Sequence, residues 1–247
     1  MLKRLLGDSV ALVFGNLETV FKICGTWFVL QFLAFGILFL LIANSSAAFF
    51  LAFIPVLAIT LAASASIAVA WHRFGLLHEY PTTFHLKLGA LEGRLILKSL
   101  ILTLMMVGCV FFVGVVQALT GSSVVAGLVG ILIALFGVPV FLRFSLILPA
   151  TAVDHPISIG EAYSISRGLG WRMFVAIFIL SLPFALISEA LAYLLKLSEG
   201  GLPVILIQLK VVILNVLSQI ILMVLSISVL TSGFRIAMER EATKAQA

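Results

Sequence analysis

Apolar side chains dominate four long stretches of the chain from which every Lys, Arg, Asp and Glu is absent. These stretches cover residues 23–72, 99–142, 173–188 and 211–234. An apolar helix needs roughly 20 residues to cross the hydrocarbon core of a bilayer, so each of the first two stretches is long enough for two crossings. Polar residues at positions 44–46 and 120–123 divide these two stretches. The pattern therefore predicts six membrane-spanning helices.

The predicted spans follow from the limits of these stretches and their polar interruptions. They lie near residues 24–43, 47–70, 99–119, 124–142, 171–190 and 211–234. The third stretch, which holds the fifth span, is short, and we expect Trp171 and Arg172 at the boundary of that span, with the arginine reaching back to the headgroups. The chain is predicted to be one all-α, polytopic membrane domain over residues 1–247, with the six spans arranged as three hairpins and both termini on one side.

The first 22 residues have the pattern of a surface helix. Leucines and valines recur there at helical spacing, with polar residues between them. Asp8, Asn16 and Glu18 interrupt any apolar core, which argues against a signal peptide. We expect residues 1–22 to form an amphipathic helix on the membrane surface before the first span.

A short motif, Arg-Phe-x-Leu, ends the second and fourth spans at Arg73 and Arg143. An amphipathic segment follows each copy, and the second of these segments contains a capping box formed by Ser158 and Glu161. It predicts an interfacial helix near residues 158–168. Interfacial helices are thus expected before spans one, three and five. The pattern fits a threefold duplication of a hairpin unit or chance repetition in an apolar chain.

The distribution of positive charge predicts the orientation. Of the 15 Lys and Arg residues, only Lys196 and Lys210 fall on the side opposite the termini. The positive-inside rule then places both termini in the cytoplasm, with residues 235–247 as a cytoplasmic tail. All three tryptophans (Trp27, Trp71 and Trp171) fall at the same predicted boundary, where indole rings are enriched.

Composition supports a membrane protein and excludes other classes. The chain is 63% hydrophobic and only 10% charged, with a mean hydropathy of +1.29. It has too few polar side chains to cover a soluble globule of this size, so a soluble enzyme or a nucleic-acid-binding domain is excluded. Its two cysteines and four histidines show no metal-binding spacing, and we expect no metal and no cofactor.

Arginines at the cytoplasmic rim are the main candidate site. The residues singled out are Arg73, Arg143, Arg167 and Arg172. A guanidinium group can hold a phosphate through two parallel hydrogen bonds, so these residues are predicted to bind anionic lipid headgroups. The simpler alternative is that they anchor the topology by contacting any headgroup.

On the side opposite the termini, Glu189 and Lys210 are the charged residues closest to the apolar interior. Charged residues within membrane segments are candidates for transport or proton relay. The structural alternative is an ion pair between Glu189 and Lys210 at the outer interface.

One stretch of the chain resembles a known family. It comprises Arg143-Phe144-Ser145-Leu146, Leu148-Pro149-Ala150, Asp154, Ser158, Glu161-Ala162, Ser166-Arg167-Gly168 and Trp171-Arg172. It is similar to poorly characterised bacterial inner-membrane proteins related to the membrane domain of glycerophosphoryl diester phosphodiesterases and to the YciC-type family. The resemblance covers about residues 140–180. It implies a membrane module without catalytic activity, because in fused members the hydrolase is a separate soluble domain.

These observations favour a non-enzymatic, multi-pass protein of the bacterial inner membrane. We expect it to bind anionic lipid or a membrane partner at its cytoplasmic rim. Its expected partners are membrane lipids, with another membrane protein or a second copy of the chain as further candidates, and no nucleic acid. The alternative is a small-substrate transporter or exporter, and the third possibility is an intramembrane lipid-modifying enzyme.

Overall fold

The computed structural model describes residues 1–44, 46–82, 84–197 and 204–246, and every regular element in this part of the chain is a helix. In chain order the helices are α1 (Leu2–Phe14), α2 (Leu17–Asn44), α3 (Ser46–Leu77), α4 (Ala90–Thr120), α5 (Ser123–Leu132), η1 (Ile133–Gly137), α6 (Val138–Phe144), α7 (Ile147–Ala152), α8 (Ile159–Ile165), α9 (Gly170–Leu197) and α10 (Val204–Ala245). Six segments are long and apolar enough to cross a membrane. The prediction of an all-α chain with six candidate spans is therefore confirmed.

The first helix is shorter than the predicted segment 1–22, because the chain turns at Gly15 and Asn16. The Gly15 N–H donates to the carbonyl of Ala11 at 2.9 Å. A Cβ at position 15 would come within 2.6 Å of that oxygen, so the turn favours glycine. The rest of the predicted segment begins α2 instead.

Two long helices extend well past the predicted spans. Helix α4 begins at Ala90, not near residue 99, and α10 runs to Ala245, so the predicted tail from residue 235 is helical. At the start of α4 the carboxylate of Glu92 accepts a hydrogen bond from the Gly89 N–H at 2.8 Å. This contact satisfies one of the free N–H groups of the first turn, which lets the helix start before the apolar stretch.

The fourth predicted span is broken into several helical pieces. Helix α5 passes into the π-helical turn η1 and then into α6, with Pro139 near its start. Proline has no N–H and its ring clashes with the preceding turn, so a widened turn before it relieves the clash. A further turn at Ser145 separates α6 from α7, and the Ser145 hydroxyl donates to the Phe141 carbonyl at 2.9 Å.

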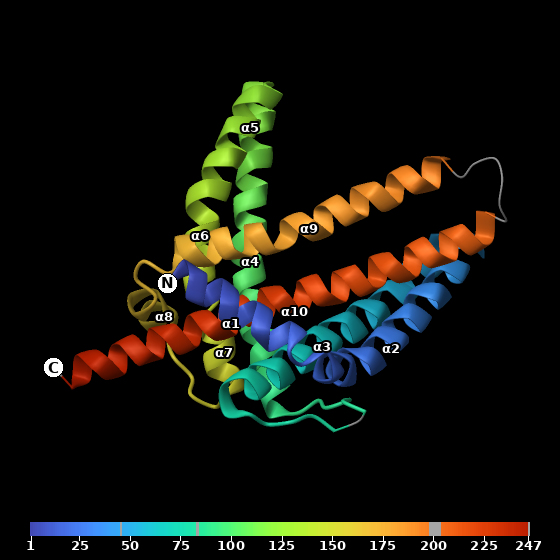
Figure 1. Cartoon of the computed structure of the whole chain (residues 1–247). Helices are drawn as coiled ribbons and strands as arrows, with labels where there is room; N and C mark the ends of the chain where they lie inside the picture. Colours follow the sequence, from blue (N-terminus) through green and yellow to red (C-terminus); the bar gives the residue numbers. More distant parts are fainter. Residues whose placement is uncertain (45, 83, 198–203, 247) are drawn as a thin grey trace.

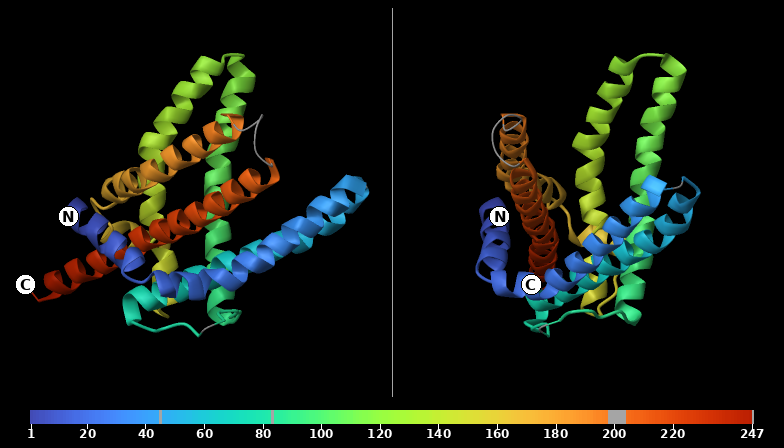
Figure 2. Two further views of the ribbon diagram at one scale, coloured as in Figure 1. Left: turned by 45° about the vertical axis from the view of Figure 1, so that its right-hand side comes forward. Right: turned by 90° about the vertical axis from the view of Figure 1, so that its right-hand side faces the viewer.

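Consecutive long helices contact one another as three pairs, α2 with α3, α4 with α5, and α9 with α10, and α3 also contacts α4 and α10. The pairs point in different directions, so their far ends lie apart (Figures 1 and 2). Helices α1, α7 and α8 pack where the pairs meet. We call this end of the molecule the base. Away from it the apolar helices are largely uncovered, and only 6% of the most apolar part of α4 is buried.

Buried side chains are concentrated at the base. One cluster joins α1, α6, α9 and α10, and a second joins α1, α2, α3 and α10. Trp71 and Trp27 belong to the second cluster and are buried within it, whereas Trp171 is exposed. Packing between helices covers the rings of Trp27 and Trp71, and the position of the three tryptophans at the membrane boundary stays a prediction.

Helix α10 makes hydrogen bonds to α3 and α1 through a row of small polar side chains. Ser228 accepts from the Trp71 indole N–H at 2.7 Å. The Thr231 hydroxyl donates to its own helix and lies 2.8 Å from Nδ1 of His72, so it accepts from that nitrogen. These contacts fix the register of α3 against α10, since a buried N–H without an acceptor is costly.

The Ser228 contact supports a test of this register. Ser228→Ala leaves the buried Trp71 N–H without an acceptor, and we expect it to lower the free energy of unfolding by about 1–3 kcal/mol. Ser226→Ala is the matched control, because the Ser226 hydroxyl donates only to the Leu222 carbonyl of its own helix. Chemical denaturation in detergent would measure both variants. Equal, small effects would show that the indole hydrogen bond contributes nothing to stability.

Candidate anion-binding site

Arg73, the first of the predicted headgroup ligands, is used within the chain. Its guanidinium group makes a two-point ion pair with Glu79, at 2.7 Å from Nε and 2.6 Å from Nη2. Its Nη1 donates to the carbonyl of Ala152 at 3.0 Å. The charge and hydrogen bonds of Arg73 keep the pKa of the Glu79 carboxyl below its usual range. Arg73 therefore tethers the segment after α3 and contacts the end of α7.

Arg143, in the last turn of α6, and Arg235, within α10, also bond to other segments of the chain. Arg143 donates from Nε to the Ser166 hydroxyl at 3.2 Å and from Nη2 to the Tyr163 carbonyl, and its guanidinium carbon lies 3.4 Å from the centroid of the Tyr163 ring. Arg235 donates to the carbonyl of Gly75. Arg73 thus connects α3 to α7, Arg143 connects α6 to α8, and Arg235 connects α10 to α3. Each bond goes to a backbone carbonyl near the negative end of a helix.

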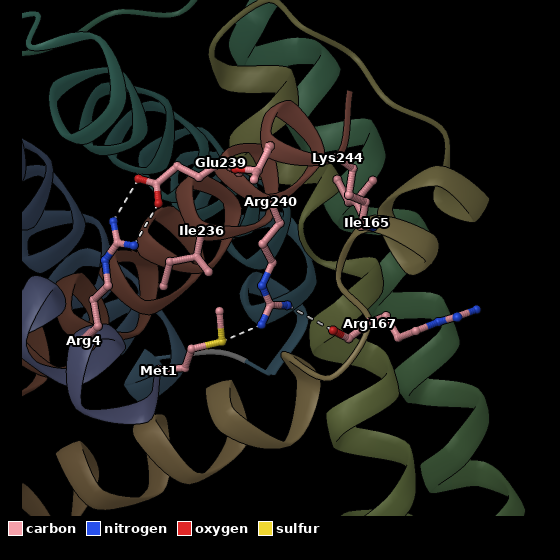
Figure 3. Close-up of a pocket in the computed structure, with 9 residues that line it drawn as sticks. Met1, Arg4, Ile165, Arg167, Ile236, Glu239, Arg240 and Lys244 are labelled. Atoms are coloured by element: carbon pink, nitrogen blue, oxygen red, sulfur yellow. Dashed lines mark hydrogen bonds and ion pairs between the residues drawn. The ribbon is translucent and has the colours of Figure 1, made fainter. Parts of the chain in front are cut away.

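A pocket of about 620 Å³ opens at the base between α1, α8 and α10 (Figure 3). Apolar and basic side chains share its wall. The residues that line it are Met1, Arg4, Ile165, Arg167, Ile236, Glu239, Arg240, Thr243 and Lys244. Two of its cations already have carboxylate partners: Arg4 pairs with Glu239 at 2.8 Å, and Lys244 pairs with Glu241 at 2.6 Å.

Two further guanidinium groups converge on one uncharged atom. Arg172 donates from Nη1 to the thioether sulfur of Met1 at 2.7 Å, and Arg240 donates to the same sulfur from Nη2. Thioether sulfur is a weak acceptor. No carboxylate of the described residues forms an ion pair with either guanidinium. Two like charges therefore meet without a counter-ion beside the pocket, an arrangement that favours the binding of an anion.

Arg167 contacts Arg240 in the pocket through its backbone carbonyl and not through its guanidinium group. Its carbonyl accepts from Nη1 of Arg240 at 3.2 Å, and Figure 3 shows its guanidinium group directed away from the pocket. The predicted set of four arginines is therefore divided. Arg167 and Arg172 lie at or beside the pocket, whereas Arg73 and Arg143 make contacts elsewhere at the base.

The local structure around Arg167 follows from its sequence. The Ser158 hydroxyl accepts from the Glu161 N–H at 3.1 Å, and the Glu161 carboxylate accepts from the Ser158 N–H at 3.4 Å, so the predicted capping box is confirmed. It starts α8, which ends at Ile165, before the predicted limit of residue 168. Gly168 then turns the chain with φ at +75°, a conformation that glycine adopts without strain.

The structure does not bring Glu189 and Lys210 together. Both side chains are exposed, and neither forms an ion pair within the described residues. The described part of the chain also contains no group of three or more His, Cys, Asp or Glu residues that could hold a metal ion.

Arg240 and Met1 are parts of the pocket that the sequence did not indicate as a site. They are 239 positions apart, and no motif joins them. A weaker signal was present in the spacing of Ile236, Arg240 and Lys244, which recur every four residues and continue α10 past its apolar stretch. That spacing predicts a helical face with an apolar side chain followed by two basic ones.

Comparison with known proteins identifies no relative: the chain matches no family model, no curated protein and no solved structure.

Proposed function

We propose that this protein is a non-enzymatic, six-span inner-membrane protein that binds the phosphate of an anionic lipid between Arg172 and Arg240. The convergence of these two guanidinium groups on the Met1 sulfur is the observation that carries the proposal. A phosphate oxygen is a much stronger acceptor than a thioether, and the guanidinium fork matches phosphate geometry. A phosphate that displaced the Met1 side chain would gain charge-assisted hydrogen bonds from both arginines.

The shape of the pocket supports a lipid as the source of this phosphate. Ile165 and Ile236 supply apolar surface beside the basic side chains, so the wall suits a molecule with both a charged and an apolar part. Basic pockets between helices on the cytoplasmic side of membrane proteins bind the headgroups of acidic lipids. A small soluble anion would use the arginines but not the apolar wall.

We place the base of the molecule at the cytoplasmic face, with both termini in the cytoplasm. In this arrangement the helix pairs are three membrane hairpins, and α1 and α8 lie in the interface. The support is the positive-inside bias, because the base carries most of the arginines of the chain. Those in contacts there are Arg4, Arg73, Arg94, Arg143, Arg172, Arg235 and Arg240.

Native mass spectrometry of the purified protein with added phosphatidylglycerol tests this site. The variant combines Arg172→Ala with Arg240→Ala, and we expect its apparent affinity for phosphatidylglycerol to fall at least tenfold. A charge-assisted hydrogen bond is worth about 1.5–3 kcal/mol, and 1.4 kcal/mol corresponds to a tenfold change in affinity. The effect on phosphatidylcholine, which carries no net charge, should be much smaller.

The matched control combines Lys3→Ala with Arg94→Ala, which removes the same positive charge from exposed positions on the predicted cytoplasmic side. It should bind phosphatidylglycerol as the wild type does. If both double variants lose binding equally, general attraction to an anionic surface explains the lipid. If neither loses binding, Arg172 and Arg240 do not form the site.

The other expectations from the sequence remain predictions. The transporter alternative, which the sequence based on Glu189 and Lys210, is one of them; within the described residues the two side chains do not form the ion pair that was the structural explanation for their charges. The resemblance of residues 140–180 to the YciC-type family likewise remains a prediction. It agrees with the proposed non-enzymatic role.

A further inference from the structure

A second cavity, independent of the proposed lipid site, lies between the end of α3, the connection to α4 and the start of α4. Its volume is about 340 Å³. The residues that matter for its chemistry are Arg73, Glu79, His85, Lys87 and Glu92. Arg73 and Glu79 neutralise each other through their ion pair, and Lys87 is exposed.

Glu92 has a buried carboxylate oxygen without a partner. The residue is only 2% exposed, and its Oε2 accepts from the Gly89 N–H, whereas Oε1 has no hydrogen-bond partner. Within the described residues Glu92 forms no ion pair. A buried carboxylate oxygen without a donor is costly, so the cavity is suited to a group that supplies one.

His85 presents a second unpartnered atom in the same cavity. It is 9% exposed, and its Nε2 is buried without a partner. Burial lowers the pKa of His85, although the charge of Glu92 and the backbone carbonyl of Ser66 act in the opposite direction. At neutral pH the ring is therefore uncharged. An uncharged imidazole carries a proton on one ring nitrogen only, and with that proton on Nδ1 the unpartnered Nε2 is an acceptor.

Glu92 and His85 thus both line this cavity, and each has a buried polar atom without a hydrogen-bond partner among the described residues. We infer that this cavity binds a primary ammonium group, which donates to Oε1 of Glu92 and Nε2 of His85. An ammonium group carries three N–H donors and a positive charge that matches the carboxylate. A metal ion fits less well, because zinc sites normally take three or four protein ligands and no group of three candidate ligands occurs in the described residues.

The exposed Lys87 also lines the cavity, and its positive charge suits a ligand that carries an anionic group as well as the ammonium group. A phosphoethanolamine group would place its ammonium at Glu92 and His85 and its phosphate toward Lys87. This group occurs both as a lipid headgroup and as a soluble molecule.

Thermal unfolding in detergent with added phosphoethanolamine, and with phosphocholine as the matched ligand, tests the inference. Phosphocholine has the same charges but no N–H donor. We expect phosphoethanolamine to raise the unfolding midpoint in a concentration-dependent manner and phosphocholine to leave it unchanged. Equal shifts, or no shift with either, would overturn the inference, as would stabilisation by zinc alone.

Glu92→Gln separates binding from folding. The amide oxygen can still accept from the Gly89 N–H, while the charge is removed and an N–H₂ group faces the cavity. We expect the dissociation constant for phosphoethanolamine to rise at least tenfold while the midpoint without ligand changes little. Asp154→Asn, which removes an exposed carboxylate paired with Arg94 at 3.1 Å, is the control and should bind as the wild type does. Unchanged binding in Glu92→Gln would contradict the assignment.

A third ligand, phosphatidylethanolamine in vesicles, shows whether the ammonium group belongs to a lipid or to a soluble molecule. Vesicles of phosphatidylethanolamine that stabilise the protein more than soluble phosphoethanolamine would indicate a lipid headgroup. Equal stabilisation would indicate a soluble amine. Loss of phosphatidylglycerol binding in the arginine variants would not affect this result, because the two sites share no residue.

Discussion

Gly170→Ala lowers the stability of the protein strongly, because α9 begins in direct contact with the backbone of α6. A Cβ at position 170 would lie 2.3 Å from the carbonyl oxygen of Pro139 and 3.0 Å from Cγ of Arg143. This oxygen belongs to the backbone of α6 and cannot turn away without distorting that helix, so α9 must move. Overpacking of this kind costs about 1–3 kcal/mol. We expect the unfolding midpoint in detergent to fall by roughly 2–10 °C.

Gly108→Ala is the matched control for this prediction. Gly108 lies inside α4, and nothing is within 4 Å of the position that a Cβ would take. Alanine has the higher helix propensity, so this variant should be unchanged or more stable by up to about 1 kcal/mol. Similar midpoints for the two variants would show that the contact between α6 and α9 tolerates a methyl group.

Arg143→Ala has the second large effect, since one guanidinium group joins α6 to α8 through three contacts. It bonds to the Ser166 hydroxyl and the Tyr163 carbonyl and stacks on the Tyr163 ring. We expect the free energy of unfolding to fall by about 1.5–3 kcal/mol, the range for hydrogen bonds to a charged group. Hydrogen exchange of the amides in α8 should also become faster, because α8 loses its attachment to α6.

Two variants distinguish a specific contact from a loss of charge. Arg143→Lys keeps the charge but not the planar fork, and should recover less than half of the lost stability. Arg94→Ala removes an exposed arginine whose pair with Asp154 leaves both side chains more than half exposed, and should cost about 0–1 kcal/mol. Full recovery by lysine would contradict the proposed geometry.

The sequence predicted the helices of this fold well where one local property, such as hydropathy or a capping hydrogen bond, is enough to form them. Uncharged stretches long enough to cross a bilayer gave the number of long apolar helices. The capping box at Ser158 and Glu161 gave the start of α8, because both partners lie within one turn. The predicted limits of α1, α4 and α10 were less accurate. Hydropathy marks where a helix enters an apolar environment and not where its backbone hydrogen bonds end.

The candidate site was predicted only in part, for a different reason. Arg73, Arg143, Arg167 and Arg172 look alike in the sequence, as basic residues at the ends of apolar stretches. Their roles differ in the structure because Arg73 pairs with Glu79, whereas Arg143 donates a hydrogen bond to the Tyr163 carbonyl of α8. Glu92 was not singled out, and its unpartnered oxygen arises only where the connection from α3 closes over the start of α4.

The sequence by itself determined that the chain is all-α and that it has six helices long and apolar enough to cross a membrane. These follow from transfer of side chains between water and hydrocarbon, which depends on composition along a short window. The tertiary structure decided which arginines are paired within the chain and which converge without a carboxylate partner among the described residues. That distinction depends on partners such as Met1 and Arg172, which are 171 positions apart and meet only through packing at the base.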